Sequence, residues 1–251
     1  MRDADAVFFT CDRERLLARQ SFWLYDCNEV VIRYGTAGIP DPDIDYKSVF
    51  LSEHLAVAET RNFLFIGRVH PKKGPDLLIK AVAALVDSGH WDRKTMRVVM
   101  AGPTGFDYAQ TLKTLAENLG ISECIYWTGM LSGEAKWGSF QAAEAFVLPS
   151  HQENFGIAVA EALSARLPVL ISHSVNISPE IRFDGAGFVE DDTLEGTILL
   201  LKRWISLPNT MRTAMRQQAR ETFLARYTSV VAAKDMQGQI FLSLAARRAG
   251  A

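Results

Sequence analysis

The sequence has few cysteines, no long apolar run and no excess of charge of either sign. Its three cysteines, Cys11, Cys27 and Cys124, stand far apart and include no C-x-x-C pair, which argues against a disulfide framework or a structural zinc site. Lys and Arg together number 27 against 29 Asp and Glu, so the charge balance indicates no nucleic-acid footprint. We expect a reducing compartment, the cytoplasm, with the cysteines as small buried side chains.

Membrane and export signals are also missing. No apolar stretch approaches the roughly 18 residues that a spanning helix requires, and the opening residues, MRDADAVFFTCDRE, lack the basic-then-apolar pattern of a signal peptide. Of the 251 residues, 48% are hydrophobic and 22% are charged, which is typical of a globular protein with one sizeable core. These features predict a soluble chain without a membrane span.

Short β-rich runs alternate with longer helical patterns after residue 60. The runs end in Gly, Pro or Ser, as buried parallel strands do, and they cover 62–67, 96–102, 124–129, 144–150 and 167–172. Helical spacing is clearest at 76–89 and 108–120. Ser178 and Pro179 predict a further helix start, with Ser178 as the N-cap and Pro179 in the first helical position. The alternation predicts an α/β fold, a Rossmann-like parallel sheet flanked by helices.

The two ends of the chain have other patterns. The first 55 residues predict, in order, a strand, a helix, a second strand and a proline- and aspartate-rich linker, at 4–10, 12–23, 29–35 and 36–46. The chain after Pro208 is predicted to be helical to its end. We predict a remnant of another domain with a linker, a Rossmann-like domain and a C-terminal helix, at 1–55, 56–225 and 226–251.

A basic loop, GRVHPKKG (67–74), follows the first predicted strand of the main sheet. Ligands of such sheets lie at the carboxyl ends of the strands, and Arg68 and Lys73 come just after Gly67 in this position. A planar guanidinium and a compact ammonium suit the oxygens of a diphosphate. Taken alone, the same residues could also form an ordinary solvated loop.

A second loop joins the strand ending near Ser150 to a helix that we expect to begin near Gly156. The backbone N–H groups of Asn154, Phe155 and Gly156 predict an anion site at the helix N-terminus. Glu153 would repel a phosphate there, so we expect it to accept hydrogen bonds from sugar hydroxyls instead.

Glu161 and two glycine-containing loops complete the candidates. Glu161 lies one and a half turns into the helix, where a carboxylate could hold the two vicinal hydroxyls of a ribose or simply face solvent. The loops at Gly102 and Met130 follow predicted strands and could let backbone groups approach a planar base, although ordinary turns would look the same.

In combination, these segments resemble the C-terminal, donor-binding half of the retaining glycosyltransferases of family four (glycosyl transferases group 1), which have the two-domain GT-B fold. The segments are, in order, GRVHPKKGPDLLIKA, VVMAGP, IYWTGMLS and EAFVLPSHQENFGIAVAEALSARLPVLIS. The diagnostic element is E-x7-E, matched by Glu153 and Glu161. The similarity runs from about residue 4 to residue 240, and residues 4–39 resemble the last strands and helix of the family's N-terminal domain.

The resemblance implies a role for each candidate. Arg68 and Lys73 match the pair that binds the donor diphosphate and stabilises it as the leaving group. Glu153 matches the glutamate that faces the transferred sugar, and Glu161 the one that holds the ribose. The remaining positions that the resemblance places against the nucleotide sugar are Gly67, Gly102, Met130, Asn154, Phe155 and Gly156.

The implied donor is a UDP- or GDP-linked sugar, transferred with retention of configuration and with neither a metal nor another cofactor. Apart from residues 4–39, this chain does not match the family's N-terminal, acceptor-binding domain, so we expect a truncated piece, one half of a split enzyme, or a subunit that binds nucleotide sugar without catalysis. Its partner would be an N-terminal-domain chain or a second copy, docked through residues 1–55 and the C-terminal helix.

A dinucleotide-dependent oxidoreductase is the other common function of alternating strands and helices. It would require a G-x-G-x-x-G turn after the first strand of the sheet. The basic sequence GRVHPKKG stands there instead, which disfavours this alternative.

Overall fold

The computed structural model describes residues 4–21, 26–104 and 107–249, with side chains up to residue 245. Its larger body is a six-stranded parallel sheet with the order β5-β4-β3-β6-β7-β8. The strands are β3 (Arg61–Ile66), β4 (Met96–Ala101), β5 (Ile125–Gly129), β6 (Ala143–Leu148), β7 (Val169–Ser172) and β8 (Gly187–Glu190).

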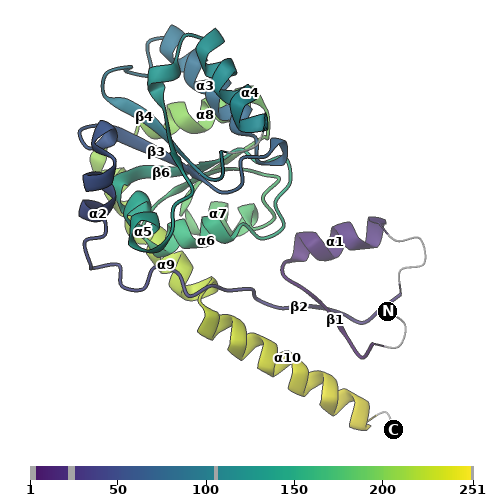
Figure 1. The fold of residues 1–251 in the computed structure, drawn as a ribbon. Coiled ribbons are helices and arrows are strands. Elements are labelled where there is room, and N and C mark those ends of the chain that lie inside the picture. The colour runs from purple at the N-terminus through teal and green to yellow at the C-terminus, as the bar shows by residue number, and fades with distance from the viewer. Residues whose placement is uncertain (1–3, 22–25, 105–106, 250–251) are drawn as a thin grey trace.

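Helices cover both faces of the sheet (Figure 1). One face carries α3 (Pro75–Asp87), α4 (Asp107–Asn118) and α8 (Leu194–Ile205). The other carries α5 (Gly133–Ala142), α6 (Ile157–Ser164) and α7 (Ser178–Asp184), with α9 (Asn209–Arg226) packed against α6 and α7. Short 3-10 helices are η1 (Leu55–Val57), η2 (Pro71–Lys73) and η3 (Ser122–Cys124).

Local sequence and burial explain these elements. The central residues of β3, 63–65, are fully buried, as expected for a parallel strand covered on both faces. Helix α3 begins with Pro75 after Gly74, which has a φ of 65°, because proline suits the first helical position and glycine tolerates the left-handed turn before it. Leu78 and Val82 of this helix are buried, and their spacing presents one apolar face to the sheet.

The N-terminal segment forms a separate unit of β1 (Val7–Phe9), α1 (Asp12–Ser21) and β2 (Glu29–Val31), with β1 and β2 paired in parallel. It lies beside the start of α10 (Ser229–Ala249), which extends away from the larger body (Figure 1). Residues 22, 23, 250 and 251 of the helices predicted at the two ends lie outside the described residues. None of the described helices is long and apolar enough to cross a membrane.

The predicted order of strands and helices is confirmed, but four expectations are corrected. Strand β8 was not predicted. Helix α2 (Lys47–Glu53) directly follows the predicted linker and packs against α5. Helix α7 begins at Ser178 itself, with Ile177 as its N-cap, and the Ser178 hydroxyl donates to the carbonyl of His173 at 3.1 Å, so the serine does not cap the helix. Cys11 and Cys124 are buried as expected, whereas Cys27 is half-buried.

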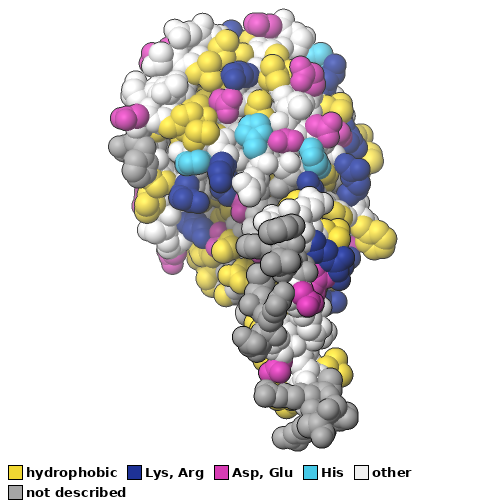
Figure 2. Space-filling view, turned by 90° about the vertical axis from the view of Figure 1, so that its right-hand side faces the viewer, with side chains coloured by type: hydrophobic (Ala, Val, Ile, Leu, Met, Phe, Trp, Pro, Cys, Tyr) yellow, Lys and Arg dark blue, Asp and Glu magenta, His cyan; other side chains and the backbone are white. Residues whose placement is uncertain are grey.

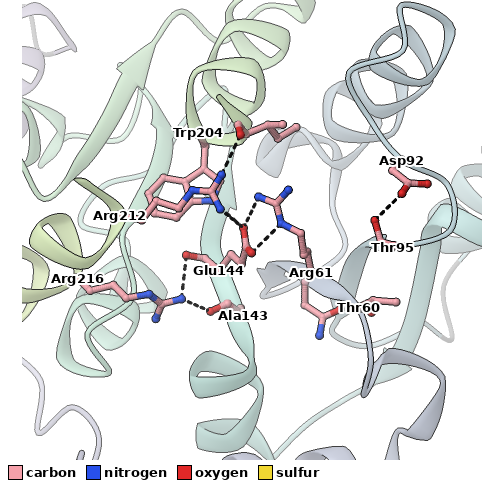
Figure 3. Close-up of polar contacts among 11 residues, drawn as sticks. Thr60, Arg61, Asp92, Thr95, Ala143, Glu144, Trp204, Arg212 and Arg216 are labelled. Atoms are coloured by element: carbon pink, nitrogen blue, oxygen red, sulfur yellow. Dashed lines mark hydrogen bonds and ion pairs between the residues drawn. The ribbon is translucent and has the colours of Figure 1, made fainter. Parts of the chain in front are cut away.

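A cluster of charged side chains joins four elements at the amino-terminal edge of the sheet (Figure 3). Arg61, the first residue of β3, donates from Nε and Nη2 to the two carboxylate oxygens of Glu144 on β6, at 2.8 and 2.9 Å. Trp204 of α8 donates to Glu144 Oε2 at 3.3 Å, and Nη1 of Arg212 on α9 lies 3.6 Å from that oxygen.

The pKa of Glu144 shows that the arginines of this cluster outweigh the effect of burial on its carboxyl group. Burial by itself would raise the pKa of the carboxyl group, but the hydrogen bonds and charge of Arg61, with the charge of Arg212, lower it below the ordinary value. The cluster therefore favours the ionised carboxylate and stabilises the folded state most where Glu144 is ionised.

Candidate functional site

The candidate site lies where the connections of the sheet change direction. Strands β4 and β5 follow on one side of β3, and β6, β7 and β8 on the other, so the loops after β3 and β6 diverge at this point. Such a switch point leaves a crevice at the carboxyl ends of the strands, where α/β sheets bind ligands.

Two adjoining cavities occupy this crevice, with volumes of about 480 and 330 Å³. The larger cavity is lined by Gly67, Arg68, Lys73, Glu153, Asn154, Phe155 and Gly156 among the candidates. The smaller is lined by Gly67, Gly102, Met130 and Glu161. They share Ile66, Gly67, Ile157 and Ala158, so together they form one groove that brings all the candidate residues into one site.

Backbone proximity explains one of the glycines in the groove. A Cβ atom on Gly102 would lie 2.0 Å from the carbonyl oxygen of Gly67, so the loops after β3 and β4 approach each other only without a side chain there. The N–H of Gly102 donates to the carbonyl of Gly129 at 2.8 Å, which ties in the loop after β5. Gly67 and Gly102 therefore line the smaller cavity with backbone alone, and the exposed side chain of Met130 lines it as well.

Helix α6 begins in the groove with Gly156 as its N-cap, at a φ of 81°. None of the described groups accepts a hydrogen bond from the backbone N–H of Asn154, Phe155 or Gly156. Free N–H groups at a helix N-terminus favour an anion. The ring of Phe155 packs edge-on to Tyr34 and Tyr227, so the part of Phe155 that is available to an anion is its backbone N–H.

Lys73 and Glu153, which both line the larger cavity, form an ion pair. Their side chains are 19% and 16% exposed, so neither charge is well hydrated. Burial lowers the pKa of Lys73, and the positive charge of Arg68 lowers it further. An anion placed beside both cations would relieve that repulsion.

Arg68 has a different environment from Lys73. Its side chain is exposed and lines the larger cavity, and no carboxylate or carbonyl in the described part of the chain pairs with its guanidinium. The larger cavity therefore contains a cation whose donors are available to a ligand. Figure 2 shows Lys, Arg and His side chains on the face of the larger body that looks toward the N-terminal segment.

Glu161 is held by a residue that the sequence did not indicate. Lys136 of α5 donates from Nζ to Glu161 Oε1 at 2.7 Å, and both side chains line the smaller cavity. The Lys136 ammonium also lies 4.8 Å from the centre of the Trp137 ring, close enough for a cation–π contact. Glu161 is thus a groove residue and does not simply face solvent.

The two loops that carry the charged residues are joined to each other. The carbonyl of Lys72 accepts from the backbone N–H of His151 at 2.8 Å and from the hydroxyl of Ser150 at 2.7 Å. Glu153 is fixed on both sides, because its N–H donates to Ser174 and its carbonyl accepts from the N–H of Asn176 at 3.0 Å. The geometry of Lys73 and Glu153 is therefore set by backbone hydrogen bonds.

Three further residues belong to the site but were not predicted. Thr10 and Tyr34 line the larger cavity from the N-terminal segment, and Asn176 is 7% exposed behind Glu153. Thr10 directly follows strand β1, so the rule that ligands lie at the carboxyl ends of parallel strands could have found it. No local pattern distinguishes Tyr34 or Asn176.

Comparison with known proteins gives a consistent result. The model of the family described as glycosyl transferases group 1 matches residues 50–222. The D-inositol 3-phosphate glycosyltransferase of Kineococcus radiotolerans is 31% identical over 173 residues, which cover 66% of this chain and 38% of that protein. The protein of the same description from Streptomyces avermitilis is 38% identical over 130 residues, 50% of this chain and 28% of the relative. The chain thus matches well under half the length of these relatives.

Solved structures share the fold at low sequence identity. A glycosyltransferase from Rickettsia africae has a TM-score of 0.80 at 17% identity, over 95% of this chain and 63% of that one. The Anabaena protein Alr3699/HepE, solved in complex with UDP and glucose, has a TM-score of 0.78 at 18% identity, over 95% and 64%. The predicted fold class, a Rossmann-like parallel sheet that forms half of a GT-B fold, is confirmed.

Proposed function

The chain belongs to the glycosyl transferases group 1 family, and from this membership we propose that its groove binds the nucleoside-diphosphate sugar of a glycosyltransferase. The reaction proposed is transfer of a sugar from a UDP- or GDP-linked donor to an acceptor, with retention of configuration and without a metal. The observation that carries the proposal is the placement of Arg68, Lys73 and the free N–H groups of residues 154–156 around one cavity.

In this proposal the two cations act on the leaving group. When the bond between sugar and diphosphate breaks, negative charge develops on the leaving oxygen, and positioned cations stabilise that charge more in the transition state than in the ground state. Arg68 would contact the diphosphate directly. Lys73 would share its charge between the diphosphate and Glu153, which lies beside it.

The two glutamates have separate tasks in the proposal. Glu153 would accept hydrogen bonds from hydroxyls of the transferred sugar. Glu161 would hold the ribose hydroxyls from the smaller cavity, where Lys136 fixes its carboxylate, while the backbone at Gly102 and Met130 would meet the base. The diphosphate would then span the wall shared by the two cavities.

Thermal unfolding with a panel of nucleotides tests this binding. We expect one of UDP, GDP and ADP, or its sugar conjugate, to stabilise the chain by about 2.7 kcal/mol at 100 times its dissociation constant, a rise in Tm of roughly 5–10 °C. The shift should disappear in Glu161→Ala and persist in EDTA, and NAD should give none.

Lys136→Ala is a companion variant, because it leaves the Glu161 carboxylate in place but removes the group that holds it. A reduced shift is expected there. A panel that produced no shift in the unmodified chain, or an equal shift in Glu161→Ala, would contradict the assignment of the groove.

A second candidate function is a nucleotide-sugar-binding subunit that works with another chain. Apolar side chains exposed on the N-terminal segment and on α10 favour it: Phe8, Leu16, Leu17, Val230, Phe241, Leu242 and Leu244. Such a surface marks a contact with protein. We propose that it docks an N-terminal domain or a second copy in the cytoplasm.

Light scattering tests this docking, with a dimer expected at high concentration if the partner is a second copy. The variant Phe241→Asp should then shift the population toward monomer, because it places a charge in an apolar contact. A strict monomer at every concentration would contradict self-association. Recovery of transfer on mixing with a separate N-terminal domain would identify a split enzyme.

A further inference from the structure

A hydrogen-bond network links the N-terminal segment to the loop before α6. Glu14 of α1 accepts from the backbone N–H and the hydroxyl of Thr10 at 2.7 and 2.6 Å through Oε2. Its other oxygen, Oε1, accepts from the side-chain amide of Asn154 at 2.9 Å. The carboxylate thus bridges two parts of the chain that are 140 residues apart in sequence.

The network continues from Asn154 to the loop that carries Glu153. Asn176 donates from its side-chain amide to Asn154 Oδ1 at 3.1 Å, and from its backbone N–H to the carbonyl of Glu153 at 3.0 Å. A displacement of the Asn154 side chain would therefore disturb Asn176, whose backbone N–H holds the carbonyl of Glu153. Asn154 is exposed, whereas Asn176 behind it is buried, so the network runs inward from the surface.

No cation in the described part of the chain pairs with Glu14, whose hydrogen-bond donors there are the neutral groups of Thr10 and Asn154. Burial would raise the pKa of its carboxyl group, but the hydrogen bonds from Thr10 and Asn154 lower it below the ordinary value. The carboxylate is therefore ionised near neutral pH, and an ionised acceptor makes the stronger hydrogen bond.

We propose that Glu14 is a positioning residue of the groove: through Asn154 it fixes the loop at residues 153–156. If that loop binds the donor diphosphate, as proposed above, the N-terminal segment is part of the donor site, although the sequence pattern placed it in another domain. Closing the first turn of α1 through Thr10 is a different role, confined to α1, and would leave the loop unaffected.

Hydrogen exchange of the 251-residue chain separates these two roles without any nucleotide. The reporters are the backbone N–H groups of Glu153 and Asn176, which are both hydrogen-bonded. We expect Glu14→Gln to speed their exchange about tenfold, because the amide that replaces the carboxylate makes weaker hydrogen bonds to Thr10 and Asn154. Asn154→Ala should do the same, and the double variant should add little to either.

Asp12→Asn is the matched control, since it removes one negative charge from the same turn of α1. Asp12 is 73% exposed and, among the described residues, forms its ion pair with Arg15 alone, so exchange at Glu153 and Asn176 should not change. Equal exchange rates in Glu14→Gln and the unmodified chain would overturn the proposal, as would effects of the two single variants that multiply in the double.

Nucleotide titration of the same proteins tests the dependence on donor binding. The nucleoside diphosphate that binds the unmodified chain should bind Glu14→Gln about 5–10-fold more weakly and Asp12→Asn equally. If no nucleotide binds the unmodified chain while exchange still rises in Glu14→Gln, the proposed function fails and the positioning role of Glu14 stands. If nucleotide binds the unmodified chain and exchange does not change in Glu14→Gln, the proposed function stands and the positioning role of Glu14 fails.

Discussion

Replacing Arg68 with alanine is expected to slow release of the nucleoside diphosphate from a UDP- or GDP-sugar by about 10²–10³-fold, or roughly 3–4 kcal/mol. The guanidinium lines the larger cavity, and its donors are not used by other groups in the described part of the chain. Because the charge that it stabilises develops as the bond breaks, kcat should fall more than KM rises. The measurement is steady-state transfer by the assembled enzyme.

Lys72→Ala is the control for this prediction, because it removes a cation from the same loop. Lys72 is exposed and does not line either cavity of the groove, so its rate should stay within about twofold of the unmodified enzyme. Equal rates for Arg68→Ala and the unmodified enzyme would refute the leaving-group role. Equal losses in both variants would indicate a diffuse effect of loop charge.

Replacing Glu144 with alanine is expected to lower the free energy of unfolding by about 2–3 kcal/mol, somewhat below the loss for a fully buried pair. The substitution leaves Arg61, Arg212 and Trp204 Nε1 without their shared acceptor. Side chains of Glu144 and Arg61 are 24% and 31% exposed, so water compensates for part of the loss. Urea unfolding should show the loss of unfolding free energy, and thermal unfolding should show a Tm lower by roughly 4–12 °C.

The control is Glu123→Ala, which breaks a surface pair with Arg93 in which both side chains are about half exposed. This variant should lower the free energy of unfolding by less than about 1 kcal/mol.

The pH dependence of the Glu144→Ala effect gives a second readout. Since the folded pKa of Glu144 lies below its ordinary value of 4.5, its stabilisation is present above that value and is lost as pH falls through the folded pKa. The difference in unfolding free energy between Glu144→Ala and the unmodified chain should therefore shrink in acid. A difference that stays constant with pH would contradict the account.

The main sheet was predictable because its strands are apolar on both faces and end in Gly, Pro or Ser. Strand β8 escaped prediction because it is a four-residue edge strand that alternates half-buried and buried positions. Helix α2 depends on distant contacts: Gln141 accepts from the backbone N–H of Tyr46 and Lys47, and Phe50 is buried. Neither contact leaves a local pattern in the sequence.

The division of the chain at residues 55 and 225, into a remnant of another domain, a Rossmann-like domain and a C-terminal helix, stays a prediction.

The candidate site was predictable where residues directly follow strands. Arg68 lies in the loop after β3 and Glu153 in the loop after β6, and the carboxyl ends of these neighbouring parallel strands lie at the same edge of the sheet. Lys136 was missed because its partner, Glu161, is 25 residues away and on another helix. Glu14 was missed for the same reason, since Asn154 is contributed by a different part of the fold. Pairings across the fold require coordinates.

A crystal structure of the chain with the nucleoside diphosphate that raises its Tm tests the central claim most directly. The account predicts the diphosphate beside Arg68, Lys73 and the N–H groups of Phe155 and Gly156, with the ribose hydroxyls on Glu161. A nucleotide bound outside the groove, or one in the groove whose ribose lies away from Glu161 and whose phosphates lie away from Arg68, would contradict it.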